Sequence, residues 1–283
     1  MSIVLAKKIG FCFGVKRAVA MAQEALRKRG PIYSLGSIIH NKEVVDALSK
    51  KGLKVIKDIK KIRRGTVVVS SHGLSPKVVK ALSERGLKII DTTCPFVRKA
   101  QKIAKSLSRK GCSIIVVGDA HHPEIRALVD FVSRDVFVVK NAVQAKKLRI
   151  GRADRISIIS QTTQSTENFL DVVKAISEKM PKEVKVFNTI CRDAEERQAS
   201  ARQLAGAVDL MLIVGGRDSA NTKRLYEVSA SILKDSYLVE TEADVADLCI
   251  KPGMVVGVAS GASTPDWVIK KVVKKIQRKG LCK

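Results

Sequence analysis

Short apolar segments alternate with helix-like segments along the whole chain. Clear examples of the apolar segments are 32–35 (IYSL), 66–69 (TVVV), 113–117 (SIIVV) and 210–214 (LMLIV). Amphipathic runs such as 95–110 and 192–204 follow strand-like runs directly. This alternation is typical of parallel sheets whose strands are joined by helices. The pattern therefore predicts an α/β protein.

Three cysteines share one setting, because each follows a strand-like run and precedes a helix-like run. They are Cys12, Cys94 and Cys191. The clearest case is the segment 91–95 (DTTCP), since proline is favoured in the first turn of a helix. Cys94 is then expected at or next to the N-cap, where the helix dipole favours a thiolate. The shared setting suggests one site assembled from three segments.

The plan repeats three times without a linker, which predicts three α/β units at 1–94 (with the N-terminal strand and Cys12), 95–191 and 192–283. Each third carries two equivalent polar loops. The first set is 39–41 (IHN), 122–124 (HPE) and 219–221 (SAN), and the second is 71–73 (SHG), 162–164 (TTQ) and 261–263 (GAS). Ligands bind at the C-terminal strand ends of such sheets. We expect three parallel-sheet units in a pseudo-threefold arrangement, with loops and cysteines at one centre.

The lack of a membrane-spanning run and of a targeting signal predicts a cytoplasmic protein. None of the six cysteines forms a CxxC pair, and in a reducing compartment they favour metal binding or catalysis over disulfides. Cys112 and Cys249 are interpreted as packed thiols and Cys282 as a tail residue. No apolar run approaches a membrane span, and we expect no removable targeting peptide before Cys12.

The formal net charge of +26 is extreme for 283 residues. Most Lys and Arg fall on helix faces, which is typical of a solvated surface. The alternative is attraction for an acidic partner, such as nucleic acid, an anionic substrate or an acidic electron carrier. Aromatic residues make up only 4% of the chain, and no aromatic-basic stretch offers a stacking platform for single strands. Nucleic acid is therefore the weaker alternative.

All four histidines lie in polar loops at strand ends. His121 is interpreted as a surface residue, whereas His40, His72 and His122 lie in the repeated loops. Histidines among Ser, Thr and Asn at helix N-termini suit an anion such as a diphosphate. They could also ligate zinc, although no single loop has the spacing for it.

Glu124 is the only carboxylate in the six loop tripeptides. It could be an ordinary charge in a first helical turn, or a proton donor in a pocket rich in hydrogen-bond donors. Asp119 and Asp218 are interpreted as turn formers. Each of the remaining candidates could be an ordinary N-cap. Only their positions in the repeated loops mark them as functional candidates. They are Thr163, Ser219, Asn221 and Ser263.

The three cysteines allow three interpretations. They could be unrelated buried thiols, although the repeated setting argues against this. A structural zinc would normally take a fourth protein ligand. A cubane iron–sulfur cluster held by three thiolates would leave one iron open to substrate. The third interpretation fits the anion-binding loops best.

At this point the motifs resemble those of the 4-hydroxy-3-methylbut-2-enyl diphosphate reductase family. The matching motifs are GFCFGVKRA at 10–18, IIHN at 38–41, SHG at 71–73, DTTCP at 91–95, HPE at 122–124, QTTQS at 161–165, NTIC at 188–191, SAN at 219–221 and SGAST at 260–264. The resemblance spans nearly the whole chain in order. One departure is Ala220, where relatives often have Ser or Gly.

The resemblance implies an oxidoreductase of the non-mevalonate isoprenoid pathway that removes an allylic hydroxyl to give isopentenyl and dimethylallyl diphosphates. It implies a [4Fe–4S] cluster on Cys12, Cys94 and Cys191. Glu124 would donate the proton, with Thr163 and His122 in the relay. A wider set would bind the diphosphate substrate: His40, His72, His122, Thr163, Ser219, Asn221 and Ser263.

The resemblance also implies single-electron delivery by an acidic ferredoxin or flavodoxin, which the positive charge of the chain would attract. Two rival functions remain at this point. One is an iron–sulfur dehydratase, which needs no electron donor. The other is a basic nucleic-acid-binding protein with a structural metal.

Overall fold

The strands form three four-stranded sheets in the computed structural model, which describes residues 1–28, 30–133, 135–150 and 155–279. Every strand pair in these sheets is parallel. The first sheet contains β2 (Ile32–Leu35), β3 (Leu53–Ile56), β4 (Thr66–Val69) and β5 (Lys88–Asp91). The second contains β6 (Ser113–Val117), β7 (Val136–Val139), β8 (Arg155–Ser160) and β9 (Glu183–Val186). The third contains β1 (Ser2–Leu5), β10 (Leu210–Val214), β11 (Ser236–Val239) and β12 (Val255–Ser260). The predicted three parallel-sheet α/β fold is confirmed.

The three sheets repeat one strand order. The orders are β3-β2-β4-β5, β7-β6-β8-β9 and β11-β10-β12-β1. The N-terminal strand therefore belongs to the third sheet, with Ile3 opposite Val256, whereas we placed it in the first unit from the sequence. The described residues from 192 to 279 supply three strands of the third sheet. Strand β1 completes it because backbone pairing depends on proximity in space and not on distance along the chain.

The third sheet is covered on both faces by helices α8 (Arg192–Ala205), α9 (Ala220–Ala230) and α10 (Asp266–Lys279), together with the short η2 (Glu242–Val245). Leu210 and Leu212 pack with residues of α10, and Met211 and Ile213 pack with residues of α8 and α9. Successive strand residues point to opposite faces, so a strand apolar at every position must be buried on both. This explains why the strand at 210–214 lacks polar alternation.

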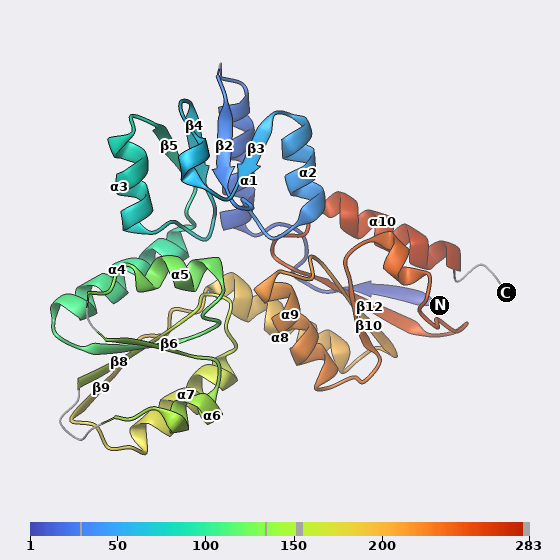
Figure 1. Ribbon diagram of the computed structural model, residues 1–283. Coiled ribbons are helices and arrows are strands. Elements are labelled where there is room, and N and C mark those ends of the chain that lie inside the picture. The colour runs from blue at the N-terminus through green and yellow to red at the C-terminus, as the bar shows by residue number, and fades with distance from the viewer. Residues whose placement is uncertain (29, 134, 151–154, 280–283) are drawn as a thin grey trace. The chain divides into compact units, whose positions relative to one another are not determined.

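Helices also cover both faces of the second sheet. Helices α4 (Pro95–Arg109) and α5 (Pro123–Val129) lie on one face, and α6 (Ala142–Lys147) and α7 (Thr166–Ser177) lie on the other (Figure 1). The first sheet is accompanied by α1 (Phe13–Leu26), α2 (Lys42–Lys50), α3 (Pro76–Glu84) and the short η1 (Ile59–Lys61). Helix α4 begins at Pro95, the proline that predicted it, and α3 also begins at a proline, Pro76.

The described residues divide into two compact units. Unit 1 comprises residues 1–16, 39–46 and 192–283, and unit 2 comprises residues 17–38 and 47–191. Unit 1 contains the third sheet, and unit 2 contains the first and second sheets. Across the described ranges, no helix is both long and apolar enough to span a membrane.

Candidate functional site

Each of the three cysteines is tied to a neighbouring loop by its backbone. In every case the cysteine N–H donates to a carbonyl in the loop that follows β4, β8 or β12. The bonds are Cys94 to Ser71 at 3.0 Å, Cys191 to Thr162 at 2.9 Å and Cys12 to Ala262 at 3.0 Å. All three cysteines also lie directly before a helix. The repeat inferred from the sequence is therefore present in the hydrogen bonding.

These bonds correct the alignment of the second set of loops. Ala262 takes the place of Ser71 and Thr162, so the third tripeptide is 262–264 and not 261–263. With this one-residue shift, His72, Thr163 and Ser263 become equivalent. Gly261 is therefore equivalent to Ser70 and Gln161. This equivalence is not visible in the sequence, because the three residues are of different types.

Helix caps correct the first set of loops as well. Asn41 accepts a bond from the Val44 N–H at 3.1 Å, and His122 and Ser219 are the N-caps of α5 and α9. Asn41 is therefore equivalent to His122 and Ser219, whereas our alignment from the sequence paired it with Glu124 and Asn221. Asn and Ser are favoured N-caps, and His122 acts as one here, so polar tripeptides alone do not locate the first helical residue.

Burial changes the chemistry expected of Cys94. Desolvation raises the pKa of the Cys94 thiol above its ordinary value, and the negative charge of Glu124 adds to this. The backbone N–H groups of Phe96 and Val97 act in the opposite direction, as expected at a helix N-terminus. The helix start therefore acts in the predicted direction, but burial outweighs it and the net shift of the Cys94 pKa is upward.

Glu124 is a buried carboxyl group with two hydrogen bonds from one threonine. Its side chain is 2% exposed. One carboxyl oxygen accepts from the Thr162 N–H and the other from the Thr162 hydroxyl, both at 2.7 Å. Burial raises the pKa of Glu124 to about 7, against the opposing effect of both bonds. A carboxyl group with this pKa is partly protonated at neutral pH, as a general acid requires.

Two histidines lie beside each other in the same unit as Glu124. The rings of His72 and His122 meet edge to face, with centroids 5.3 Å apart. The His122 Nδ1 atom accepts from the Glu124 N–H at 3.2 Å, which orients the ring over the start of α5. Gly73 allows the loop that carries His72 to approach α4, because a Cβ atom at this position would lie 2.5 Å from the side-chain nitrogen of Gln101.

Thr163, which the sequence favoured as the relay partner of Glu124, has a different neighbour. Its hydroxyl accepts from the Gln161 side-chain amide at 3.2 Å. The residue that contacts Glu124 is Thr162, which we did not select from the sequence. The doubled threonine was a visible signal, but which of the two faces α5 depends on the turn after β8.

Unit 1 contains a second group of candidates. The Ser263 hydroxyl donates to the His40 carbonyl at 3.0 Å. Burial lowers the pKa of His40, with Asp218 raising it and Lys223 lowering it further. Ser219 caps α9 by accepting from the Thr222 N–H at 3.3 Å.

Asn221, in the first turn of α9, has the most unusual environment of the unit 1 candidates. Its side chain is 4% exposed, and neither its amide nitrogen nor its oxygen has a hydrogen-bond partner among the described residues. A buried amide without partners is costly, so such a group calls for a ligand.

The loop before Cys12 is held by a buried arginine that we missed in the sequence. Arg197 is 3% exposed and donates to the carbonyls of Gly10 at 2.9 Å and Ser260 at 3.2 Å. It also pairs with Asp193 at 2.7 Å. The sequence did not distinguish it, because it lies in a helical segment with several other charged residues. This arginine joins the Cys12 loop to the end of β12.

Arg197→Met is expected to lower the free energy of unfolding by about 3 kcal/mol, because it leaves Asp193 and two carbonyls without their donor. Urea denaturation of the purified variant measures this change. Arg202→Met, at an exposed position on the same helix, is the matched control and is expected to stay within about 0.5 kcal/mol. Equal losses in both variants would contradict the role given to Arg197.

The structure also tests the interpretations that the sequence suggested for the other cysteines and for His121. Cys112 is buried, as expected of a packed thiol, whereas Cys249 is exposed. Cys282 lies outside the described residues. His121 is exposed, and Asp119 forms a turn by accepting from the His121 N–H at 3.0 Å.

The chain matches one protein-family model and is similar in sequence to several known proteins. The family model "LytB protein" matches residues 3–277. The chain is 43% identical to a 4-hydroxy-3-methylbut-2-enyl diphosphate reductase of Pelobacter propionicus, covering 98% of both chains. It is 44% identical to the reductase of the same name from Geobacter sulfurreducens, covering 98% of this chain and 97% of the relative.

Two solved structures are also similar. The E-1-hydroxy-2-methyl-but-2-enyl-4-diphosphate reductase from Plasmodium falciparum matches with a TM-score of 0.91 and 27% identity, over 96% of this chain and 87% of that one. A structure of (E)-4-hydroxy-3-methyl-but-2-enyl diphosphate reductase, described as the terminal enzyme of the non-mevalonate pathway, matches with a TM-score of 0.69 and 38% identity. It covers 98% of this chain and all of that one.

Proposed function

Because the chain belongs to the LytB family, we propose that it catalyses the reductive dehydroxylation of 4-hydroxy-3-methylbut-2-enyl diphosphate to isopentenyl and dimethylallyl diphosphates. The reaction breaks the allylic C–O bond and forms a C–H bond. It consumes two electrons and two protons, and the hydroxyl oxygen leaves as water. The chain is thus an oxidoreductase of isoprenoid biosynthesis, and we place it in the cytoplasm.

The observation that carries this proposal is Glu124, a buried carboxyl group with a pKa of about 7. Protonation of the departing hydroxyl turns a poor leaving group into water, and a neutral carboxyl group at this pH can supply that proton. Thr162 orients both oxygens of the carboxyl group, and His122 fixes the backbone of Glu124. We therefore add Thr162 to the proposed relay of Thr163 and His122.

The cysteines fit a three-thiolate cluster. The five cysteines in the described part of the chain are present as thiols, and the proposed ligands Cys12, Cys94 and Cys191 share one backbone setting. Thiolates are the ligands that iron–sulfur clusters take, and binding displaces the thiol proton that burial favours on Cys94. A bound [4Fe–4S] cluster would supply single electrons and one open iron for the hydroxyl oxygen.

The diphosphate is assigned to the polar loops at the helix starts. Asn221 has an amide with unsatisfied hydrogen-bonding capacity. Ser219 lies at the N-cap of the same helix, where N–H groups favour an anion. The remaining proposed contacts come from the other repeated loops: His40, His72, His122, Thr163 and Ser263.

The rate is expected to fall as pH rises through about 7. Glu124 must be protonated to act as an acid, and its pKa of about 7 means that the protonated fraction drops about tenfold per pH unit above this value. The measurement is kcat/KM from pH 6 to 9 with a fixed reductant supply, because kcat/KM reports the pKa values of the protein without bound substrate. A rate that stays constant to pH 9 would contradict the assignment of Glu124.

Two threonine variants provide the control for this pH profile. The hydrogen bond from the Thr162 hydroxyl lowers the pKa of Glu124. Thr162→Val should therefore move the falling limb to higher pH, in addition to any loss of rate. Thr163→Val is expected to leave the position of the limb unchanged. The reverse result would show that Thr163, and not Thr162, acts on Glu124.

We further propose that an acidic ferredoxin or flavodoxin delivers the electrons. The +26 formal charge of the chain supports this, because opposite charges accelerate encounter. Raising the salt from about 0.05 to about 0.5 M is expected to slow reduction by such a donor about tenfold. Reduction by a small uncharged reductant is the control. An unchanged rate with the protein donor would exclude electrostatic steering.

A further inference from the structure

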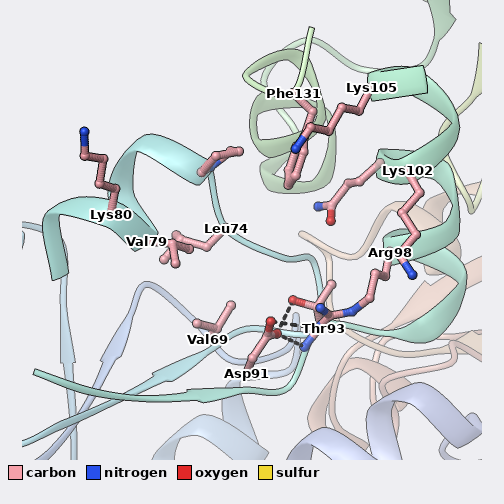
Figure 2. Close-up of a pocket in the computed structure, with 12 residues that line it drawn as sticks. Val69, Leu74, Val79, Lys80, Asp91, Thr93, Arg98, Lys102, Lys105 and Phe131 are labelled. Atoms are coloured by element: carbon pink, nitrogen blue, oxygen red, sulfur yellow. Dashed lines mark hydrogen bonds and ion pairs between the residues drawn. The ribbon is translucent and has the colours of Figure 1, made fainter. Parts of the chain in front are cut away.

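Unit 2 contains a cavity of about 460 Å³ that the proposed reaction does not use. It lies between the first sheet with α3 on one side and α4 with the end of α5 on the other (Figure 2). A volume of this size is typical of sites for small molecules.

One face of α4 lines the cavity with polar and basic side chains. Arg98, Gln101, Lys102 and Lys105 follow the spacing that places residues on a single helix face. Lys80 of α3 adds a fourth cation across the cavity (Figure 2). The only carboxylate among the lining residues is Asp91. The lining therefore has an excess of positive charge, which favours an anion.

Asp91 is already engaged within its own turn. It accepts from the Thr93 N–H at 2.9 Å and from the Thr93 hydroxyl at 2.5 Å (Figure 2). Arg98 donates to its other oxygen at 2.6 Å, and both charged side chains of this pair are 44% exposed. A partly exposed pair is weak, so Arg98 can turn to a stronger anion while Thr93 continues to satisfy Asp91.

Gln101 provides an independent sign of a ligand. Its side chain is 5% exposed, and its amide nitrogen has no hydrogen-bond partner in the part of the chain that the structure describes. Burying an amide N–H without an acceptor is costly. An acceptor oxygen on a molecule within the cavity would satisfy it. Gln101 lies between the charges of Arg98 and Lys102 on the same helix face.

The rest of the lining is apolar. Val69 and Leu74 come from the first sheet and the loop after it, Val79 comes from α3, and Phe131 closes the cavity beside α5 (Figure 2). These side chains would exclude water from an alkyl or prenyl chain. An inorganic anion would leave this part of the cavity unfilled.

We propose that this cavity is a binding site for a small amphipathic anion, with its phosphate on Arg98, Lys102 and the Gln101 amide and its apolar chain against Val79 and Phe131. Neither Glu124 nor any residue assigned to the diphosphate lines the cavity, although Leu74 belongs to the same loop as His72. Binding requires neither a cluster nor turnover.

Octyl phosphate is a suitable probe, since it joins one phosphate to an apolar chain. We expect the full-length protein to bind it with a Kd of about 0.1 to 1 mM by isothermal titration calorimetry. Inorganic phosphate has the anion without the apolar chain, and 1-octanol has the chain without the anion. Each should bind at least tenfold more weakly. Excess inorganic diphosphate should not displace it, because the residues assigned to the diphosphate are not among the lining residues of the cavity.

Two variants on α4 locate the site. Lys102→Glu reverses a charge in the lining and should weaken octyl phosphate binding at least fivefold. Lys99→Glu makes the same charge change on the same helix, outside the cavity lining, and should change Kd less than twofold. Val79→Trp should fill the cavity and remove binding. Equal effects of Lys102→Glu and Lys99→Glu, displacement by diphosphate, or no binding at 5 mM probe (~5 times the weakest expected Kd) would each overturn the proposal.

Discussion

Glu124→Gln is expected to lower kcat by about 10³-fold without loss of the proposed iron–sulfur cluster. Glutamine has nearly the shape of glutamic acid, and its carbonyl oxygen can still accept from the Thr162 N–H. It has no acidic proton, so the hydroxyl of the substrate would have to leave without protonation. Glu124 is the proposed proton donor of the buried site, and Thr162 donates a hydrogen bond of 2.7 Å to each of its carboxyl oxygens.

The measurement is single-turnover product formation with reduced protein, together with the visible spectrum of the same sample. Glu167→Gln is the matched control, because Glu167 is also the second residue of a helix but is exposed. It should retain near-normal turnover. If Glu124→Gln retained such turnover with an intact spectrum, the proton would have to come from another group. Loss of the spectrum in Glu124→Gln would instead indicate a role in holding the metal site.

Cys94→Ser and Cys191→Ser are each expected to abolish cluster binding and to lower activity by at least about 10³-fold. A serine hydroxyl is a poor substitute for thiolate at iron, because it is not deprotonated at neutral pH. Both cysteines keep their backbone bonds to the neighbouring loops in the serine variants, so the fold should persist. Far-ultraviolet circular dichroism checks that it does.

The decisive measurement is iron and acid-labile sulfide per chain in protein prepared without oxygen. Cys249→Ser is the control, since Cys249 is an exposed thiol outside the repeated loops. It should keep the iron and sulfide content of the parent protein. Full iron content in Cys94→Ser, or zinc alone in the parent protein, would rule out the proposed ligand set.

The same preparation separates the two rival functions. A dehydratase built on a three-cysteine cluster would turn over without a reductant, whereas the reductase requires one. A nucleic-acid-binding protein with a structural metal would bind RNA or DNA tightly at low salt, and this binding would survive Glu124→Gln.

Local signals in the sequence were sufficient for the architecture. Apolar runs such as 210–214 indicate buried parallel strands because both of their faces are apolar. Pro95 begins a helix as predicted, since proline suits a first helical turn. The strand–cysteine–helix setting is equally local, and it correctly places Cys12, Cys94 and Cys191 directly before helices.

Long-range contacts decided the features that the sequence left open or that we assigned wrongly. Strand β1 joins the third sheet because pairing with β12 depends on where the chain folds back. Arg197 could be recognised as an anchor only from its contact with Gly10, 187 residues away. Neither pairing has a signature in the neighbouring residues.

The chemistry of the site depended on tertiary structure in the same way. Thr162 and Thr163 are indistinguishable in sequence, and the turn after β8 selects Thr162 for Glu124. Burial by distant segments raises the pKa of Glu124 to about 7 and outweighs the helix N-terminus at Cys94. The sequence by itself determined which residue types stand at the strand ends. The packing around them decided their protonation and their partners, because desolvation and hydrogen bonding depend on neighbours in space.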